Sequence, residues 1–107
     1  MQLGLILETN DAERLWNAFR FANTALEAGH AVDTFLLGDG VEAPDVETDA
    51  FNPHGVMMKY VNEGGELIAC GTCLDSRDID ADDLRPRGTM GDLLGIVEAA
   101  DEVITFG

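Results

Sequence analysis

Residues 1–37, MQLGLILETNDAERLWNAFRFANTALEAGHAVDTFLL, decide the fold, because they predict a strand, a helix and a second strand in that order. The apolar run Gln2–Leu7 is typical of a short buried strand. Within residues 11–28 the apolar side chains recur at helical spacing and form one stripe, made of Leu15, Phe19, Ala22 and Leu26. Gly29 suits the position that ends such a helix, and residues 31–37 contain the β-branched and aromatic side chains of a strand. The segment therefore predicts a β-α-β unit.

The rest of the chain continues this alternation. We expect strands at residues 66–69 and 102–106, helices at residues 53–63 and from Thr89 onward, and a short helical turn that ends near Arg77. The inner stripe of the helix after Thr89 is predicted to consist of Met90, Leu93, Leu94 and Val97.

The connections are predicted from their turn-forming and acidic residues. Residues 38–40 suit a tight turn, residues 41–51 an exposed acidic loop, and residues 85–88 a short strand or a turn. Strands that alternate with helices predict a single α/β domain over residues 1–107, with a mostly parallel sheet and helices on both of its faces.

The charge of the chain excludes several classes of function. Asp and Glu number 21 against six Lys and Arg, so the formal net charge is −15. Such a surface repels phosphate backbones and anionic lipids, and we expect direct binding to neither nucleic acid nor membranes. The charge favours a halophilic protein, in which salt screens the self-repulsion, and a basic partner protein is the alternative. Without a long apolar run or a basic leader, a cytoplasmic location is expected.

The candidate site follows from the topology. In parallel sheets, binding and catalytic residues gather outside the carboxyl ends of the strands. Three predicted loops meet there, namely residues 8–11, 38–41 and 70–77. Gly38 and Asp39 are therefore candidate binding residues, and Cys70 to Arg77 contain the strongest local motif.

That motif is Cys70-Gly71-Thr72-Cys73, and four interpretations compete for it. A structural disulfide is disfavoured in a cytoplasmic protein. A zinc site lacks ligands, because only His30 and His54 would complete the pair of cysteines. Two inert buried thiols remain an open alternative. We favour a reactive thiol at a strand-to-helix junction.

A reactive Cys70 has a physical basis in the predicted helical turn. At the start of that turn, backbone N–H groups favour a thiolate, and Arg77 is a candidate cationic partner. The acidic residues of the same segment oppose it, namely Asp75, Asp78, Asp80, Asp82 and Asp83. The sequence leaves the balance open. These aspartates do not match a calcium loop, and Gly38-Asp39-Gly40 is too short for a dinucleotide fingerprint, so we expect no metal and no cofactor.

The chain resembles the DsrE/DsrF-like sulfur-relay family over nearly its whole length. The resemblance lies in the order and spacing of the opening strand and helix, of GHAV at 29–32, of FLLGDGV at 35–41, of residues 67–77, and of ADEVITF at 100–106. Small archaeal and bacterial members are the most similar, and together with the charge this favours a haloarchaeal source.

The resemblance implies a three-layer α/β/α sandwich with a sheet of four to five strands, assembled as a homotrimer or homohexamer. It implies that Cys70 carries sulfane sulfur as a persulfide between donor and acceptor proteins, as a sulfurtransferase component. Arg77 matches an arginine that some members have seven positions after this cysteine, whereas Asp78 stands where many carry glycine. Gly71 and Thr72 would line the site, and Cys73 would resolve the persulfide or only pack.

Two other classes of function remain open. Cys70 and Cys73 together suit a redox switch that closes to a reversible disulfide. A non-catalytic oligomeric subunit or binding module, with both thiols buried, is the third hypothesis, and Trp16 is a candidate subunit contact.

Overall fold

Five parallel strands form the centre of the protein in a computed structural model that describes all residues 1–107. The elements in chain order are β1 (Gln2–Leu7), α1 (Ala12–Glu27), β2 (Ala31–Leu36), the 3₁₀ helix η1 (Gly38–Asp45), α2 (Pro53–Asn62), β3 (Glu66–Cys70), α3 (Gly71–Asp75), β4 (Arg87–Gly88), α4 (Met90–Ala99) and β5 (Glu102–Phe106). The strand order is β4-β3-β2-β1-β5, and every neighbouring pair is parallel. The predicted α/β fold is confirmed.

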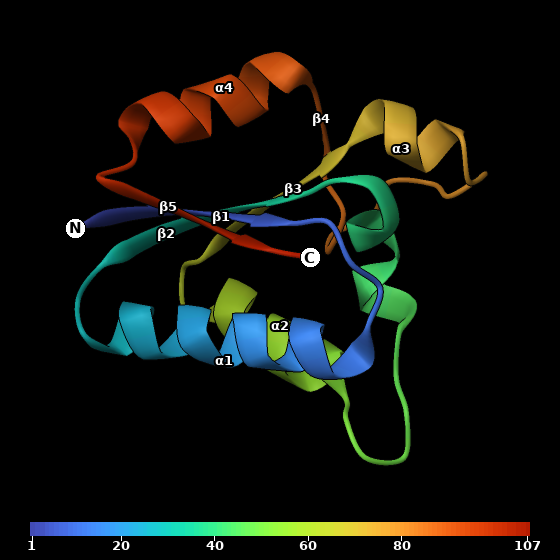
Figure 1. Ribbon diagram of the computed structural model, residues 1–107, viewed down its shortest axis with the longest axis horizontal. Helices are drawn as coiled ribbons and strands as arrows, with labels where there is room; N and C mark the ends of the chain where they lie inside the picture. Colours follow the sequence, from blue (N-terminus) through green and yellow to red (C-terminus); the bar gives the residue numbers. More distant parts are fainter.

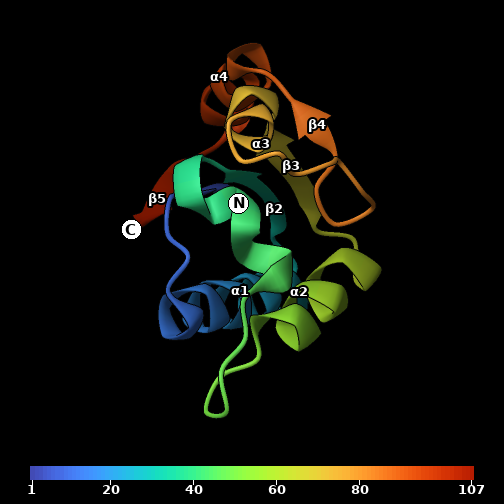
Figure 2. The same cartoon turned by 90° about the vertical axis from the view of Figure 1, so that its right-hand side faces the viewer.

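Helices cover both faces of the sheet, which gives the three predicted layers (Figure 1). α1 and α2 lie side by side on one face, whereas α3 and α4 lie on the other. Figure 2 views the carboxyl ends of the strands, where η1 and α3 follow β2 and β3. These two connections therefore border the candidate site. None of the helices combines the length and apolar character needed to cross a lipid bilayer.

The main core lies between the sheet and the pair α1–α2. Leu15, Phe19 and Ala22 of the predicted stripe are buried against the sheet. Asp11 begins α1 as its N-cap, since its Oδ2 accepts the backbone N–H of Arg14 at 2.9 Å. The first β-α-β unit is therefore formed as the sequence predicts.

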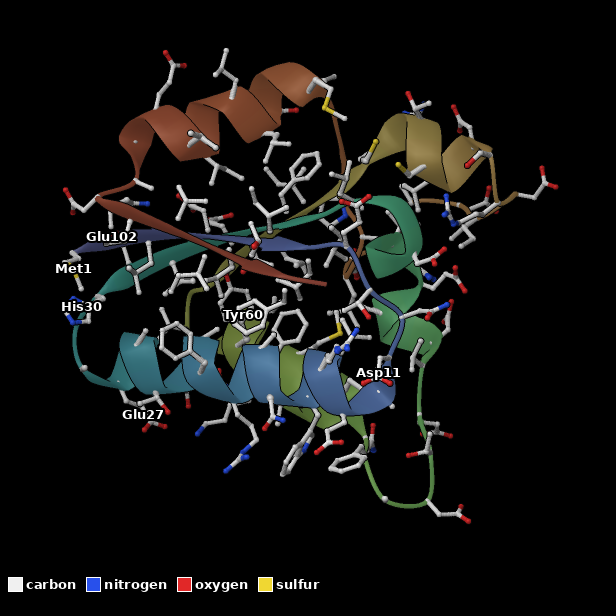
Figure 3. All side chains as sticks on the ribbon, in the orientation of Figure 1. Met1, Asp11, Glu27, His30, Tyr60 and Glu102 are labelled. Atoms are coloured by element: carbon white, nitrogen blue, oxygen red, sulfur yellow. The ribbon has the colours of Figure 1, made fainter.

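Tyr60 fastens α2 to the sheet inside this core (Figure 3). Its hydroxyl accepts a hydrogen bond from Thr34 Oγ1 at 3.0 Å and donates to the carbonyl oxygen of Glu66 at 2.6 Å. Burial disfavours the phenolate and raises the pKa of Tyr60. Gly65 is needed beside it, because a Cβ there would lie 2.2 Å from the tyrosine ring. These contacts fix β3, and with it the start of the candidate site.

The segment after β2 differs from the prediction. Residues 38–45 form η1 rather than a tight turn and an exposed loop, and Val41 and Ala43 are fully buried. The reason is a long-range contact, since Arg85 donates to the carbonyl oxygen of Val41 at 3.4 Å and pairs with Asp45 at 2.6 Å. Asp45, one of the acidic residues that predicted a solvated loop, is thus the ion-pair partner of the buried Arg85.

The predicted inner stripe of α4 is wrong for three of its four residues, and only Leu93 packs against the core. The capping box of Thr89 and Asp92 begins this helix as expected, but its only buried residue is Ile96. The helix instead exposes three large apolar side chains, namely Met90 at 57%, Leu94 at 57% and Val97 at 41%. Helical spacing identifies an apolar stripe but does not say whether the same chain covers it. α4 therefore presents an apolar surface to the outside of the chain.

Candidate functional site

Cys70 is the last residue of β3 and the N-cap residue of α3. It pairs in register with Gly88 of β4, so it lies at the carboxyl edge of the sheet beside an edge strand. In parallel sheets, ligands often bind where the strand order reverses. In this sheet that point lies away from Cys70, between β1 and β5. Only 3% of Cys70 is exposed. A reagent that is to reach this sulfur must displace part of its cover.

Arg87 forms part of the surroundings of Cys70, and the sequence gave no local signal for this role. Its guanidinium makes a bidentate ion pair with Asp75, at 2.8 and 2.7 Å. The same group packs against Gly71, where a Cβ would lie 2.8 Å from Arg87 Cζ and Nε. The hydrogen bond to Asp75 raises the pKa of Arg87, and the nearby Cys70 adds to this effect. A positive charge therefore stands beside Cys70.

Cys73 lies within α3, three residues after Cys70, and the two thiols are near enough to interact electrostatically. Its Sγ accepts the backbone N–H of Gly38 at 3.2 Å, and it is partly exposed. Burial and the neighbouring Cys70 raise the pKa of the Cys73 thiol, whereas the Gly38 N–H and the charge of Arg77 lower it. The pKa is raised on balance, which favours the protonated form of Cys73.

Arg77 lies on the Cys73 side of the pair. Its guanidinium binds Asp39 at 2.9 Å and Glu42 at 3.4 Å, and it donates to the carbonyl oxygen of Cys73 at 3.2 Å. The hydrogen bond to Asp39 is the main reason why the pKa of Arg77 is raised. Arg77 thus ties the end of α3 to η1, and the structure brings it together with Cys73, Gly38 and Asp39.

Thr72 and Asp78, which the sequence also singled out, lie on the surface of the loop. Thr72 is exposed, and Asp78 has a φ of +53°, in the left-handed region that favours glycine. Aspartate is one of the few other residues that tolerates this conformation, which explains how Asp78 fits the loop. Of the acidic residues expected to oppose a thiolate, Asp75 is neutralised by Arg87 and Asp82 by Arg85.

Arg85 is the second functional candidate without a sequence signal. Its side chain is 9% exposed and joins Asp82 at 2.9 Å to Asp45 at 2.6 Å. It therefore holds η1, which begins with the Gly38 N–H donor, against the loop before β4. This role of Arg85 is visible only in the folded chain, where the side chain pairs with acidic residues from two separate segments, Asp45 of η1 and Asp82 of the loop before β4.

The two histidines lie away from the thiols. His30 Nδ1 is 2.7 Å from the N-terminal amine of Met1, and His54 Nδ1 is 3.2 Å from the carbonyl oxygen of Pro44. No three side chains of His, Cys, Asp or Glu are grouped so that they could hold a metal ion. The chemistry of this edge of the sheet therefore resides in two thiols, two arginines and the backbone.

A parallel five-stranded sheet with two neighbouring thiols at the carboxyl end of β3 defines a small α/β thiol protein. Comparisons with known proteins give the family. The sequence model of the DsrE/DsrF-like family matches residues 1–106, and the chain belongs to this family.

Two archaeal relatives are similar over most of their length. The uncharacterized protein MJ0989 of Methanocaldococcus jannaschii is 37% identical over 103 residues, which cover 88% of each chain. The uncharacterized protein MK0008 of Methanopyrus kandleri is 35% identical over 103 residues, covering 88% of this chain and 83% of the relative.

Solved structures support the same fold. The crystal structure of the ychN protein from Escherichia coli superimposes with a TM-score of 0.83 at 26% identity, over 99% of this chain and 100% of that one. A conserved protein of unknown function, BT1422 from Bacteroides thetaiotaomicron, gives a TM-score of 0.77 at 14% identity, over 97% and 93% of the two chains. The second likeness concerns the fold alone.

Proposed function

We propose that this protein carries sulfane sulfur as a persulfide on Cys70. The family to which the chain belongs is of the sulfur-relay type, which supports this class of chemistry. The single observation that carries the proposal is the position of Cys70 at the carboxyl end of β3 and the start of α3, with Cys73 and Arg87 near it.

The position of Cys70 favours it over Cys73 as the carrier. Cys70 ends β3 at the carboxyl edge of the sheet and begins α3, and parallel sheets gather their reacting groups at this edge. Arg87 packs against the adjacent Gly71, close enough for its positive charge to interact with Cys70. The raised pKa of Cys73 favours the protonated form of that thiol.

The transfer step is an ordinary thiol exchange. The Cys70 thiolate attacks the outer sulfur of a donor persulfide, R–S–SH. A bond forms between Cys70 Sγ and that sulfur while the donor S–S bond breaks, so the products are Cys70–S–SH and the donor thiolate R–S⁻. An acceptor thiolate attacks the outer sulfur in the same way and restores the Cys70 thiolate. Electrons balance in both steps without an added oxidant.

Access to Cys70 depends on a cover that is easily moved. Arg87 and Asp75, which flank it at α3, have 53% and 65% of their side chains exposed. An ion pair in this position stabilises the closed form by only about 0.2–1 kcal/mol. The α3 segment itself has only five residues. We therefore expect the Arg87–Asp75 pair to part often enough for small persulfides to enter, while the buried Leu74 and the Arg77–Asp39 pair hold α3 itself in place.

The test counts sulfur atoms gained per chain by intact mass after exposure to a low-molecular-weight persulfide. The wild type should gain sulfur, Cys70→Ser should gain none, and Cys73→Ser should still gain it. Each exchange of sulfur for oxygen changes the volume little, so the two variants are matched controls for folding. Equal uptake by Cys70→Ser and wild type would refute the assignment, and loss only in Cys73→Ser would move the carrier role to Cys73.

A cysteine-pair redox switch is the second candidate, and the position of both thiols in the first turn of α3 favours it. Attack of Cys73 on the inner sulfur of the Cys70 persulfide would give a Cys70–Cys73 disulfide and release HS⁻. Two results together would favour the switch. An oxidant such as diamide would convert the wild type to the disulfide, and a sulfur donor would give no persulfide.

We also propose that the chain assembles into a homotrimer or homohexamer through α4. The exposed apolar side chains Met90, Leu94 and Val97 lie on this helix, and Val103 of the neighbouring β5 is 38% exposed. Apolar contact drives association of such surfaces, whereas the net charge of −15 opposes it until salt screens the charge. Trp16, the candidate contact from sequence, packs instead on Phe51 with ring centroids 5.2 Å apart.

A further inference from the structure

A groove on the outer surface of α1 and α2 contains polar groups that the thiol pair does not use. Its volume is about 390 Å³, within the usual range for small-molecule sites. Its walls include Arg20, Phe21, Asn23 and Glu27 from α1, and Val56 and Lys59 from α2. These helices lie on the face of the sheet opposite α3 (Figures 1 and 2), so the groove is separate from the thiol pair.

Asn23 gives the groove an unused hydrogen-bond acceptor. The residue is 5% exposed, and its Nδ2 donates to the carbonyl oxygen of Val56 at 3.1 Å. Its Oδ1 is the one buried side-chain oxygen or nitrogen of the protein without a partner. Buried polar atoms almost always have partners, so this oxygen points to a missing hydrogen-bond donor. Less than 1 Å² of the atom is exposed, so a ligand in the groove reaches it once the side chains that cover it shift.

Arg20 gives the groove a positive charge with unused donors. The chain has only six Lys and Arg beside 21 Asp and Glu. Carboxylate partners are found for four of the six, namely Lys59, Arg77, Arg85 and Arg87. Arg20 has none. It lies 4.2 Å over the ring of Trp16 and donates only to Asn17 Oδ1, at 3.2 Å. Aromatic stacking holds the guanidinium in place and leaves its other N–H groups free for an anion.

The rest of the groove is neutral or apolar. Glu27 binds Lys59 at 2.8 Å, so this pair closes one part of the wall without net charge, and Figure 3 shows Glu27 on the side of α1 away from the sheet. Phe21 and Val56 add apolar surface. The groove therefore combines one free cation, one free buried acceptor and an apolar wall.

We propose that this groove binds a small amino carboxylate with an apolar side chain. The carboxylate binds the free guanidinium of Arg20, and the ammonium displaces the side chains that cover Asn23 Oδ1 and donates to this oxygen. The side chain packs on Phe21 and Val56. Each part of the ligand thus meets the group that the protein leaves without a partner, and a zwitterion adds no net charge to a strongly acidic protein.

The test is calorimetric titration of the intact protein at constant ionic strength with three matched probes. The first is L-leucine, the second is isocaproate, which lacks the amino group, and the third is isoamylamine, which lacks the carboxylate. Leucine should bind, and each of the others should bind about tenfold or more weakly, the factor expected when one charge-assisted hydrogen bond is lost. Failure of leucine to bind, or equal binding of isocaproate, would overturn the proposal.

Variants locate the binding. Arg20→Gln and Asn23→Leu should each weaken leucine binding by about tenfold, whereas Arg14→Gln should leave it unchanged. Arg14 is the matched control, because it is also on α1, exposed and without a carboxylate partner, but lies outside the groove. Arg20 is exposed, so its variant decides the outcome even if Asn23→Leu does not fold. Leucine binding equal in Arg20→Gln and wild type would contradict the assignment.

Discussion

Replacing Arg85 by leucine tests whether the two acidic segments beside the thiol pair are held by this one buried cation. Arg85 is 7% exposed and donates to the carbonyl oxygen of Val41 and to the carboxylates of Asp45 and Asp82. The leucine variant keeps the apolar stem of the side chain but removes these donors. We expect η1 to loosen and the free energy of unfolding to fall.

The size of the loss follows from the exposure of the partners. Removing one member of a fully buried ion pair costs about 3–5 kcal/mol. The side chains of Asp45 and Asp82 are 65% and 47% exposed, so water replaces much of what they lose. We therefore expect a loss of about 2–3 kcal/mol, equivalent to about 10–20 °C in Tm for a domain of this size.

The pH dependence gives a second, independent signature. Burial works against ionisation of Asp82, but Arg85 and two backbone N–H groups outweigh it and hold the pKa of this carboxyl below its usual value. A lowered folded-state pKa stabilises the protein above the unfolded-state pKa of about 3.9, and this stabilisation is lost as the pH falls through the folded-state value. The difference between wild type and Arg85→Leu should therefore be full at about pH 7 and shrink below about pH 4.

Urea unfolding followed by circular dichroism in molar potassium chloride measures both effects. Arg14→Leu is the matched control, because Arg14 has no carboxylate partner, and its change should stay within about 0.5 kcal/mol. An Arg85→Leu protein as stable as wild type, or a difference that does not change with pH, would refute the role given to Arg85.

Three further predictions concern the thiols, the surface of α4 and the charge. Arg77→Gln should raise the pH at which Cys73 is alkylated by iodoacetamide, because the charge of Arg77 lowers the pKa of that thiol; an unchanged or lower midpoint would contradict this. The double change Leu94→Asp and Val97→Asp should give an 11.5 kDa monomer in sedimentation at molar salt with an unchanged far-ultraviolet spectrum, and a monomeric wild type would rule out the interface. The Tm should rise as potassium chloride increases from low to molar concentration, since screening weakens repulsion among the carboxylates, and a flat curve would show that the charge is no adaptation to salt.

The elements whose apolar pattern is complete within one segment could be predicted from the sequence. The stripe of α1 and the two strands beside it needed no distant information, and they form as expected. η1 could not be predicted, because the burial of Val41 depends on Arg85, which lies 44 residues further along the chain. The orientation of α4 was missed for a related reason, since nothing in the chain covers Met90, Leu94 and Val97 of its apolar stripe.

The candidate site was predictable to a similar extent. Cys70 and Cys73 are three positions apart in the sequence at the end of a predicted strand, and the predicted topology brings the loop at Gly38 to the same edge. Arg87 reaches Cys70 only because β4 pairs with β3 in a register that places Arg87 opposite Ala69. A two-residue strand has too little pattern to reveal such a register. Pairings of this kind are set by the folded chain rather than by local spacing.

The most direct test of the central claim locates sulfur in the native chain, without any substitution. The protein is exposed briefly to a persulfide donor, trapped by rapid alkylation and digested with trypsin, which cuts after Lys59 and Arg77 and leaves both cysteines in the peptide 60–77. Fragmentation of this peptide by tandem mass spectrometry distinguishes the two sulfur atoms. We predict that the extra sulfur is on Cys70. Extra sulfur on Cys73 alone, or on neither cysteine, would contradict the proposed function.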